Sequence, residues 1–162
     1  MRRTSLVPRL FSLATFVWAL DFLTKNWAIA NLSTAPRKII GSFLQLTLLR
    51  NPGAAFSLAT GFTIIFTSLS IAVAIFIMRT AARITHPWWA VVAGLVLGGV
   101  LGNLSDRIFR EPGFLYGHVI DWIQIPHWPV FNIADSAITI AAGIAILLTA
   151  RNIAPYKSGK HE

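Results

Sequence analysis

The sequence predicts an all-α membrane protein of four transmembrane helices with a small β-sheet at one end. Of its 162 residues, 55% are hydrophobic and only 12% are charged, whereas an ordinary soluble domain has about 25% charged residues. Four stretches are long and apolar enough to cross a hydrocarbon core about 30 Å thick, which needs about 20 residues of helix. This composition excludes a disordered chain, a nucleic-acid-binding module and most monomeric soluble folds. The length fits a single membrane-embedded domain over residues 1–162.

The first predicted helix covers residues 10–30 and contains Asp21 and Lys25. Arg2 and Arg3, with the Ala-Ile-Ala sequence at 28–30, have the form of a cleavable secretion signal. Asp21 and Lys25 separate the apolar run from that cleavage site, however, so we expect the segment to remain as a transmembrane helix.

The other helices are predicted at 54–78, 88–106 and 132–150. Gly94, Gly98 and Gly102 recur at four-residue spacing in the third helix, and small residues on one face let helices approach closely in lipid. One further turn along the same face lies Asp106. We therefore expect the glycines and this aspartate to face the interior of the bundle.

Basic residues predict the orientation. The net charge is +8, and 8 basic residues fall in the 30 positions of the segments 1–9, 79–87 and 151–162. Short loops rich in Lys and Arg stay in the cytoplasm. Both termini are therefore expected to be cytoplasmic, with the basic residues near anionic lipid head groups and no nucleic-acid partner.

A strand is predicted in the first outer segment, where residues 44–48 alternate apolar and polar side chains. Asn51, Pro52 and Gly53 then form a turn signal. These features predict a small sheet on the outer membrane surface, with an unstructured tether as the alternative.

Four of the six acidic residues lie within apolar segments or at their outer edges. An ionised carboxylate costs about 2.5–3.5 kcal/mol at the centre of a membrane helix, so such residues are usually paired or functional. We expect Asp21 to pair with Lys25 four residues later, the lysine reaching outward, and Asp106 to pair with the adjacent Arg107 near Asn103. These pairs favour structural support over chemistry.

Asp121 and Asp135 lack such an explanation. Asp121 has apolar neighbours, and Asp135 follows Asn132 with the spacing of a helix cap. Two carboxylates at a membrane edge suggest an acid/base pair that shares one proton and activates water. Asp135, at a helix N-terminus, is the better candidate for the ionised member, and Asp121 for the protonated one.

Three other chemistries remain open. Lys25 with Ser57 is a candidate nucleophilic pair. His118, Asp121, His127 and Asp135 are candidate metal ligands. A small proton-coupled transporter also places aspartates within a helix bundle. The chain has no cysteine, which excludes disulfides and thiolate chemistry.

Five fragments in order resemble the lipoprotein signal peptidases, the type II signal peptidases of bacteria. They span most of residues 21–136 and read DFLTK at 21–25, NPGAAFS at 51–57, GGVLGNLSDR at 98–107, GHVID at 117–121 and FNIADS at 131–136.

The resemblance implies an aspartyl endopeptidase that removes the signal peptide of prolipoproteins just before a diacylglyceryl-modified cysteine. It implies that Asp121 and Asp135 are catalytic, and that the following residues support the site or hold substrate: Asp21, Lys25, Asn51, Gly53, Asn103, Asp106, Arg107 and Asn132. It also implies inhibition by globomycin, no metal or organic cofactor, a location in the bacterial inner membrane with the site near its outer face, and a short surface helix beside the sheet.

The chain departs from the family pattern between Asp106 and Asp121. That segment is longer than in many members, and the segment between Asp121 and Asp135 is correspondingly short. Both differences fall where a flap over the site is expected, so they affect substrate preference and inhibitor fit rather than the chemistry.

Overall fold

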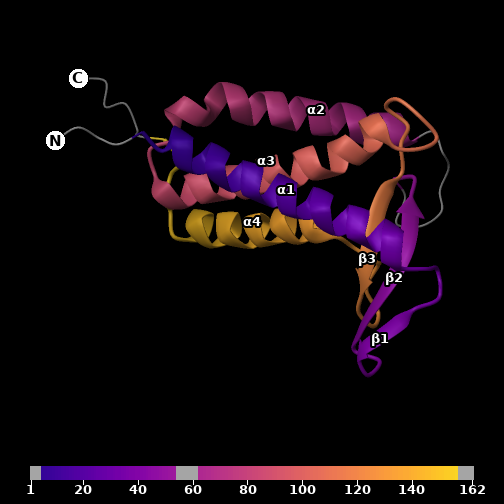
Figure 1. Cartoon of the computed structure of the whole chain (residues 1–162). Coiled ribbons are helices and arrows are strands. Elements are labelled where there is room, and N and C mark those ends of the chain that lie inside the picture. The colour runs from indigo at the N-terminus through magenta and orange to yellow at the C-terminus, as the bar shows by residue number, and fades with distance from the viewer. Residues whose placement is uncertain (1–4, 54–61, 157–162) are drawn as a thin grey trace, which may run out of the picture.

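Within residues 5–53 and 62–156, which the computed structural model describes, four long helices and three strands form a bundle with a sheet at one end (Figure 1). The helices are α1 (Val7–Asn31), α2 (Phe62–Thr80), α3 (Pro87–Phe109) and α4 (Ile133–Ala150), with a short 3-10 turn η1 (Ala81–Arg83). The strands are β1 (Arg37–Ile40), β2 (Leu44–Asn51) and β3 (Val119–Gln124). All four predicted helices are present, although the predicted start of the second lies outside the described residues.

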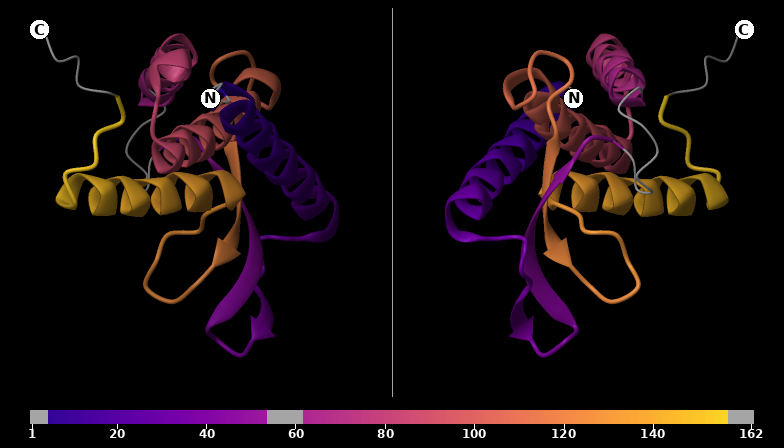
Figure 2. Two further views of the ribbon diagram at one scale, coloured as in Figure 1. Left: turned by 90° about the vertical axis from the view of Figure 1, so that its left-hand side faces the viewer. Right: turned by 90° about the vertical axis from the view of Figure 1, so that its right-hand side faces the viewer.

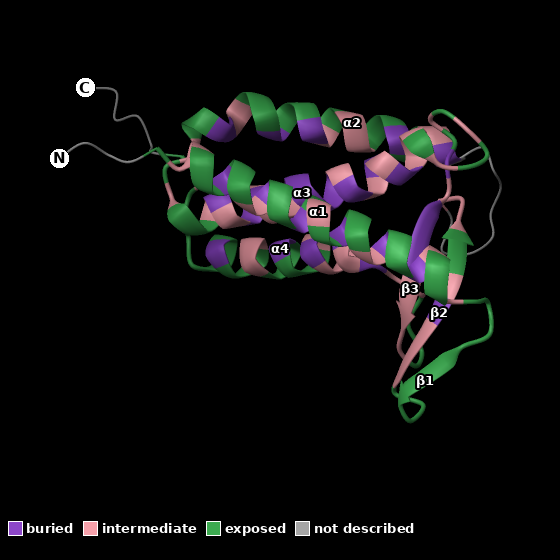
Figure 3. Ribbon diagram, viewed as in Figure 1, coloured by how far each residue is buried: buried purple, intermediate pink, exposed green. Residues whose placement is uncertain are grey.

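α3 is the central helix and packs against α1, α2 and α4 (Figure 2). Half of its most apolar stretch is buried, against 22% for each of the others. The outer faces of α1, α2 and α4 remain exposed (Figure 3), and their side chains there include Phe16, Leu69 and Ile146. All four helices are long and apolar enough to cross a membrane. An exposed apolar surface on such helices is suited to contact with lipid.

The glycine face of α3 packs closely against α1, as predicted. A Cβ atom on Gly98 would lie 2.6 Å from the carbonyl oxygen of Ala14, and one on Gly102 would lie 2.5 Å from Asp21 Oδ2. Gly99 approaches α4 in the same way, 2.6 Å from the Ala134 carbonyl oxygen. These contacts bring the polar residues of α1, α3 and α4 within reach of one another.

The sheet is antiparallel in the order β1-β2-β3 and extends beyond the bundle at the end remote from the start of α1 (Figure 1). The predicted strand at 44–48 is present as part of the central strand, whereas β1 and β3 were not predicted. Leu49 pairs with Asp121 and Asn51 with Val119, so Asp121 sits in a strand that β2 holds in register.

The surface helix beside the sheet stays a prediction, because residues 54–61, between β2 and α2, lie outside the described residues. The connection 110–118 at this end consists of turns, and η1 lies in the α2–α3 connection at the opposite end. Pro112 and Gly113 explain the absence of a helix from residues 110–118, because Pro lacks an N–H and Gly113 has a positive φ of 146°.

Candidate active site

Asp121 is held in the middle of β3 with only 1% of its surface exposed. Asn51, diagonally opposite on β2, donates its side-chain N–H to Asp121 Oδ2 at 2.9 Å. Asn132 donates to the other oxygen, Oδ1, at 2.6 Å. Both carboxylate oxygens therefore receive an amide donor, and their orientation is fixed.

Burial raises the pKa of the Asp121 carboxyl to about 7, since removal from water disfavours the charged form. The N–H donors of Asn51 and Asn132 oppose this rise in pKa, while the negative charge of Asp135 adds to it. A carboxyl with this pKa can donate or accept a proton near neutrality.

Asp135 lies in the first turn of α4, where it completes a capping box with Asn132. The backbone N–H of Asp135 donates to Asn132 Oδ1 at 2.9 Å, and the backbone N–H of Asn132 donates to Asp135 Oδ2 at 3.3 Å. Asn103 on α3 donates its side-chain N–H to Asp135 Oδ1 at 2.8 Å. The predicted cap is confirmed, and it places the Asp135 carboxylate at the N-terminus of α4.

Asn132 thus bonds to both Asp121 and Asp135, which brings the two carboxylates into one site between β3 and α4. Asn132 is fully buried, and it also donates to Asn103 Oδ1 at 3.1 Å. The two asparagines form an amide bridge along one side of the aspartate pair.

Lys25 lies beneath this bridge and is fully buried. Its ammonium group is 2.6 Å from Asp21 Oδ2 and 2.8 Å from Asp106 Oδ2, and it donates to Asn103 Oδ1 at 2.8 Å. The predicted pair with Asp21 is confirmed. The expectation that Lys25 reaches outward is wrong, because two ion pairs and one hydrogen bond hold its ammonium group inside the bundle.

The predicted pairing of Asp106 with Arg107 is also wrong. Asp106 binds Lys25 and Arg110 instead, and its Oδ2 accepts the backbone N–H of Ile120 at 3.1 Å. Adjacent residues on a helix point in different directions, whereas residues four apart share a face. That i,i+4 spacing was the signal that could have identified Arg110.

The bond to Ile120 gives Asp106 an indirect connection to Asp121. Asp106 accepts the Ile120 N–H, and Asn132 donates to the Ile120 carbonyl at 3.3 Å. Ile120 is fully buried. The backbone N–H and carbonyl of Ile120, the residue that precedes Asp121, are therefore both held by side chains, a role for backbone atoms that the sequence alone did not reveal.

Arg107 and Gly53 complete the predicted set. The Arg107 guanidinium donates to the backbone carbonyl of Asn103 at 3.2 Å. Its positive charge interacts with the carboxylates of Asp135, Asp106 and Asp121. Gly53 has a φ of 109°, which favours glycine, and its N–H donates to Asn51 Oδ1 at 2.9 Å. The predicted turn is present, and it orients the Asn51 amide so that its NH₂ group faces Asp121.

The structure tests the alternative metal site but not the alternative nucleophilic pair of Lys25 and Ser57. No three His, Cys, Asp or Glu side chains gather into a metal-binding group in the described part of the chain, so His118 and His127 form no such cluster with Asp121 and Asp135. Ser57, the candidate nucleophile beside Lys25, lies outside the described residues.

The sequence model of the family described as Signal peptidase (SPase) II matches residues 13–151. The chain belongs to this family. A lipoprotein signal peptidase from Rhodococcus jostii (strain RHA1) is 48% identical over 147 residues, which cover 90% of this chain and 74% of the relative. One from Mycobacterium avium (strain 104) is 47% identical over 148 residues, covering 91% and 80%. A solved bacterial membrane enzyme has a TM-score of 0.81 and 27% identity, covering 94% of this chain and 99% of that one.

Membership of the signal peptidase II family makes the chain a membrane aspartic peptidase. The family resemblance noted in the sequence is confirmed, and nothing supports the transporter alternative. A peptidase of this class needs one carboxyl that accepts a proton from water and one that donates a proton to the substrate carbonyl. The described site provides two carboxylates that share a bridging residue.

Proposed function

We propose that this chain removes the signal peptide of bacterial prolipoproteins, cleaving just before the diacylglyceryl-modified cysteine, with Asp121 and Asp135 as its catalytic pair. The observation that carries the assignment is that both carboxylates accept hydrogen bonds from Asn132 in a member of this family: Asp121 from its side-chain N–H and Asp135 from its backbone N–H.

In the proposed mechanism, Asp135 is ionised and takes a proton from the attacking water, while protonated Asp121 donates its proton to the scissile carbonyl oxygen. The resulting tetrahedral intermediate collapses as the carbonyl re-forms, the C–N bond breaks, and the leaving amine takes the proton from Asp135. Asp121 recovers its proton from the collapsing intermediate. The raised pKa of Asp121 and the position of Asp135 at a helix N-terminus support this division of roles.

The remaining site residues hold this pair in place. Asn51, Asn103 and Asn132 supply N–H donors, Gly53 forms the turn that positions Asn51, and Asp21, Lys25 and Asp106 form the charged base. The positive charge of Arg107 interacts with Asp121 and Asp135 and is proposed to support the reacting groups. No metal or organic cofactor takes part.

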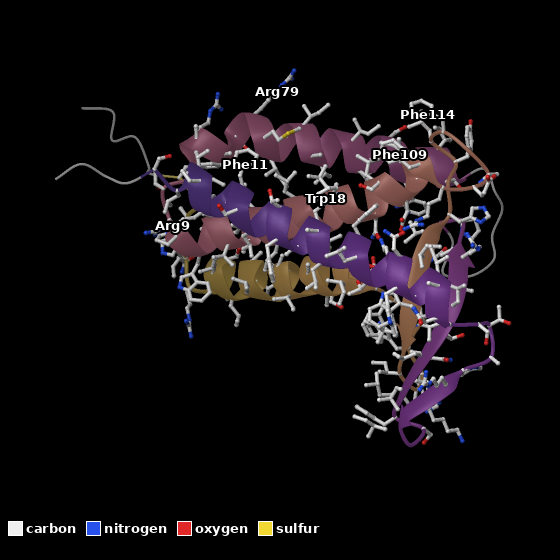
Figure 4. The ribbon with its side chains drawn as sticks, in the orientation of Figure 1. Arg9, Phe11, Trp18, Arg79, Phe109 and Phe114 are labelled. Atoms are coloured by element: carbon white, nitrogen blue, oxygen red, sulfur yellow. The ribbon has the colours of Figure 1, made fainter. Side chains whose placement is uncertain are left out.

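The site is proposed to face the outer side of the bacterial cytoplasmic membrane, with the whole chain acting as one membrane-embedded peptidase domain. Arg9, Arg83 and Arg151 lie at the end of the bundle remote from the sheet, and Figure 4 shows Arg9 at that end and Phe114 at the opposite end. The positive-inside rule therefore supports an outer location for the sheet. Reporter fusions at Arg83 and Lys157 should report cytoplasm and one at Lys38 the outer side. A cytoplasmic signal at Lys38 would reverse this orientation.

The proposed substrate is amphiphilic, with an apolar signal helix and two acyl chains, and it reaches the site by lateral diffusion among the membrane lipids. Globomycin-type inhibitors are proposed to bind at the same site.

Conversion of a purified, lipidated preprolipoprotein by this protein in detergent, followed by gel mobility, tests the function. We expect cleavage of the lipidated precursor, also in the presence of strong chelators, and no cleavage of the same precursor without its diacylglyceryl group. Loss of cleavage with EDTA and recovery with zinc would contradict the cofactor-free mechanism.

A further inference from the structure

The ammonium group of Lys25 makes the shorter of two contacts that fix the orientation of the Asn103 side-chain amide beside the catalytic pair, at 2.8 Å against 3.1 Å for the Asn132 N–H. Lysine has three N–H donors and no acceptor. Its contact with Asn103 at 2.8 Å must therefore be with the carbonyl oxygen, Oδ1. The NH₂ group of Asn103 is consequently turned the other way, toward Asp135 Oδ1 at 2.8 Å.

This orientation matters because the two faces of an amide have opposite effects on a neighbouring carboxyl. An N–H that donates to a carboxylate stabilises its ionised form, whereas a carbonyl oxygen in the same place accepts a bond only from the protonated form. With Asn103 turned as observed, Asp135 is kept ready to accept a proton.

We infer that Lys25 is a positioning residue that locks the Asn103 amide with its NH₂ group toward Asp135, and so sets which aspartate of the pair is ionised. The inference rests on the proposed function. Two observations make Lys25 suited to this role: it is fully buried, and the carboxylates of Asp21 and Asp106 hold its ammonium group from the other side.

Several charges act on the same site and must be separated from the amide effect. Asp21 on α1 and Asp106 on α3 contact Lys25, Arg110 contacts Asp106, and Arg107 interacts with the charges of Asp106, Asp121 and Asp135. Removing Lys25 alone changes the local net charge by one unit. That change would affect the ionisation of the aspartate pair electrostatically, in addition to any effect through the Asn103 amide.

The test therefore removes a buried cation and anion together, in the double variant Asp21→Asn/Lys25→Met. The local net charge is unchanged, and the new amide at position 21 keeps an acceptor for the Ala134 N–H that Asp21 Oδ1 now receives at 2.9 Å. Asn103→Ala removes the amide itself, and the triple variant combines all three changes. For each, cleavage of lipidated precursor is measured against pH, and thermal unfolding in detergent reports folding.

We expect the acid limb of the profile to move up by about 1 pH unit in the double variant, because Asp135 loses a reliable donor. Asn103→Ala should show the same shift, and the triple variant should show no further shift. An unchanged acid limb in the folded double variant, or shifts that add in the triple variant, would overturn the inference.

Asn103→Ala leaves the Lys25–Asp21 pair in place and keeps the inference testable if the double variant does not fold. An unchanged acid limb in Asn103→Ala would contradict it directly. The proposed function fails by a different result, namely cleavage that persists in Asp135→Asn.

Discussion

The side-chain N–H of Asn132 donates to Asp121 Oδ1 at 2.6 Å, while its own Oδ1 caps α4. One residue thus serves as the N-cap of a membrane helix and as the donor to an aspartate in a strand. Because the same cap brings Asp135 to the site, helix initiation and assembly of the carboxylate pair depend on one side chain.

The two functions of Asn132 can be separated by substitution. Asn132→Ala should lower the free energy of unfolding by about 1 kcal/mol through loss of the cap. It should also reduce kcat/KM by about ten- to a hundredfold, because leaving the buried Asp121 carboxyl without its donor costs about 1–3 kcal/mol. Asn132→Ser is the matched control, since serine caps a helix but is too short to replace the donor to Asp121. It should be more stable to unfolding than the alanine variant, because it keeps the cap, yet lose activity to the same extent; full activity in Asn132→Ser would show that the donor is dispensable.

Asp106 is expected to support the fold of the site without taking part in the chemistry. Asp106→Asn removes one carboxylate from Lys25 and the partner of Arg110 but keeps an acceptor for the Ile120 N–H. We expect a loss of up to about 3 kcal/mol of stability, because Lys25 retains Asp21, and a partial loss of activity. Arg110→Gln, at a position whose side chain is 15% exposed, should have a smaller effect. Complete loss of turnover with unchanged thermal unfolding would instead assign Asp106 to the chemistry.

Close packing of α1 on α3 predicts strong sensitivity at Gly98. A Cβ atom there would lie 2.6 Å from the Ala14 carbonyl oxygen, so Gly98→Ala must push the helices apart, at about 1–3 kcal/mol. Gly143→Ala on α4 is the control, because nothing lies within 4 Å of the added methyl group. It should be neutral or stabilising by up to about 1 kcal/mol. Equal unfolding temperatures for the two variants in detergent would refute this packing argument.

The pH dependence of cleavage should reflect the titration of Asp121. If protonated Asp121 polarises the scissile carbonyl, activity falls as the pH rises through its pKa of about 7. Asn51→Ala removes an N–H that favours the ionised form, so the pKa of Asp121 should rise and the basic limb should move to higher pH. A profile of kcat/KM that stays flat from about pH 6 to about pH 9 would contradict this role.

The sequence alone predicted the features that depend on residues close together along the chain. The four helices follow from apolar stretches of about 20 residues. The Asp21–Lys25 pair, the glycine face of α3 and the cap formed by Asn132 follow from spacings of three or four residues. The resemblance to a known family then identified the set of polar residues that the fold brings together.

Contacts between distant segments were not predictable from such patterns. Strands β1 and β3 depend on pairing with β2, and β3 with its buried Val119 and Ile120 shows no alternation that marks it as a strand. The burial of Lys25 required Asp106 and Asn103, which lie about eighty residues further along the chain. The bond from Ile120 to Asp106 uses the backbone N–H of Ile120, so the identity of the residue at position 120 gives no sign of it.

Single replacement of each aspartate of the pair tests the central claim most directly. Asp121→Asn and Asp135→Asn preserve size while each removes one half of the proton cycle, so both proteins should unfold near the wild-type temperature and still bind globomycin. We predict that neither converts the lipidated prolipoprotein, which should accumulate as the uncleaved precursor on a gel. Processing near the wild-type rate by either folded variant would contradict the aspartyl mechanism.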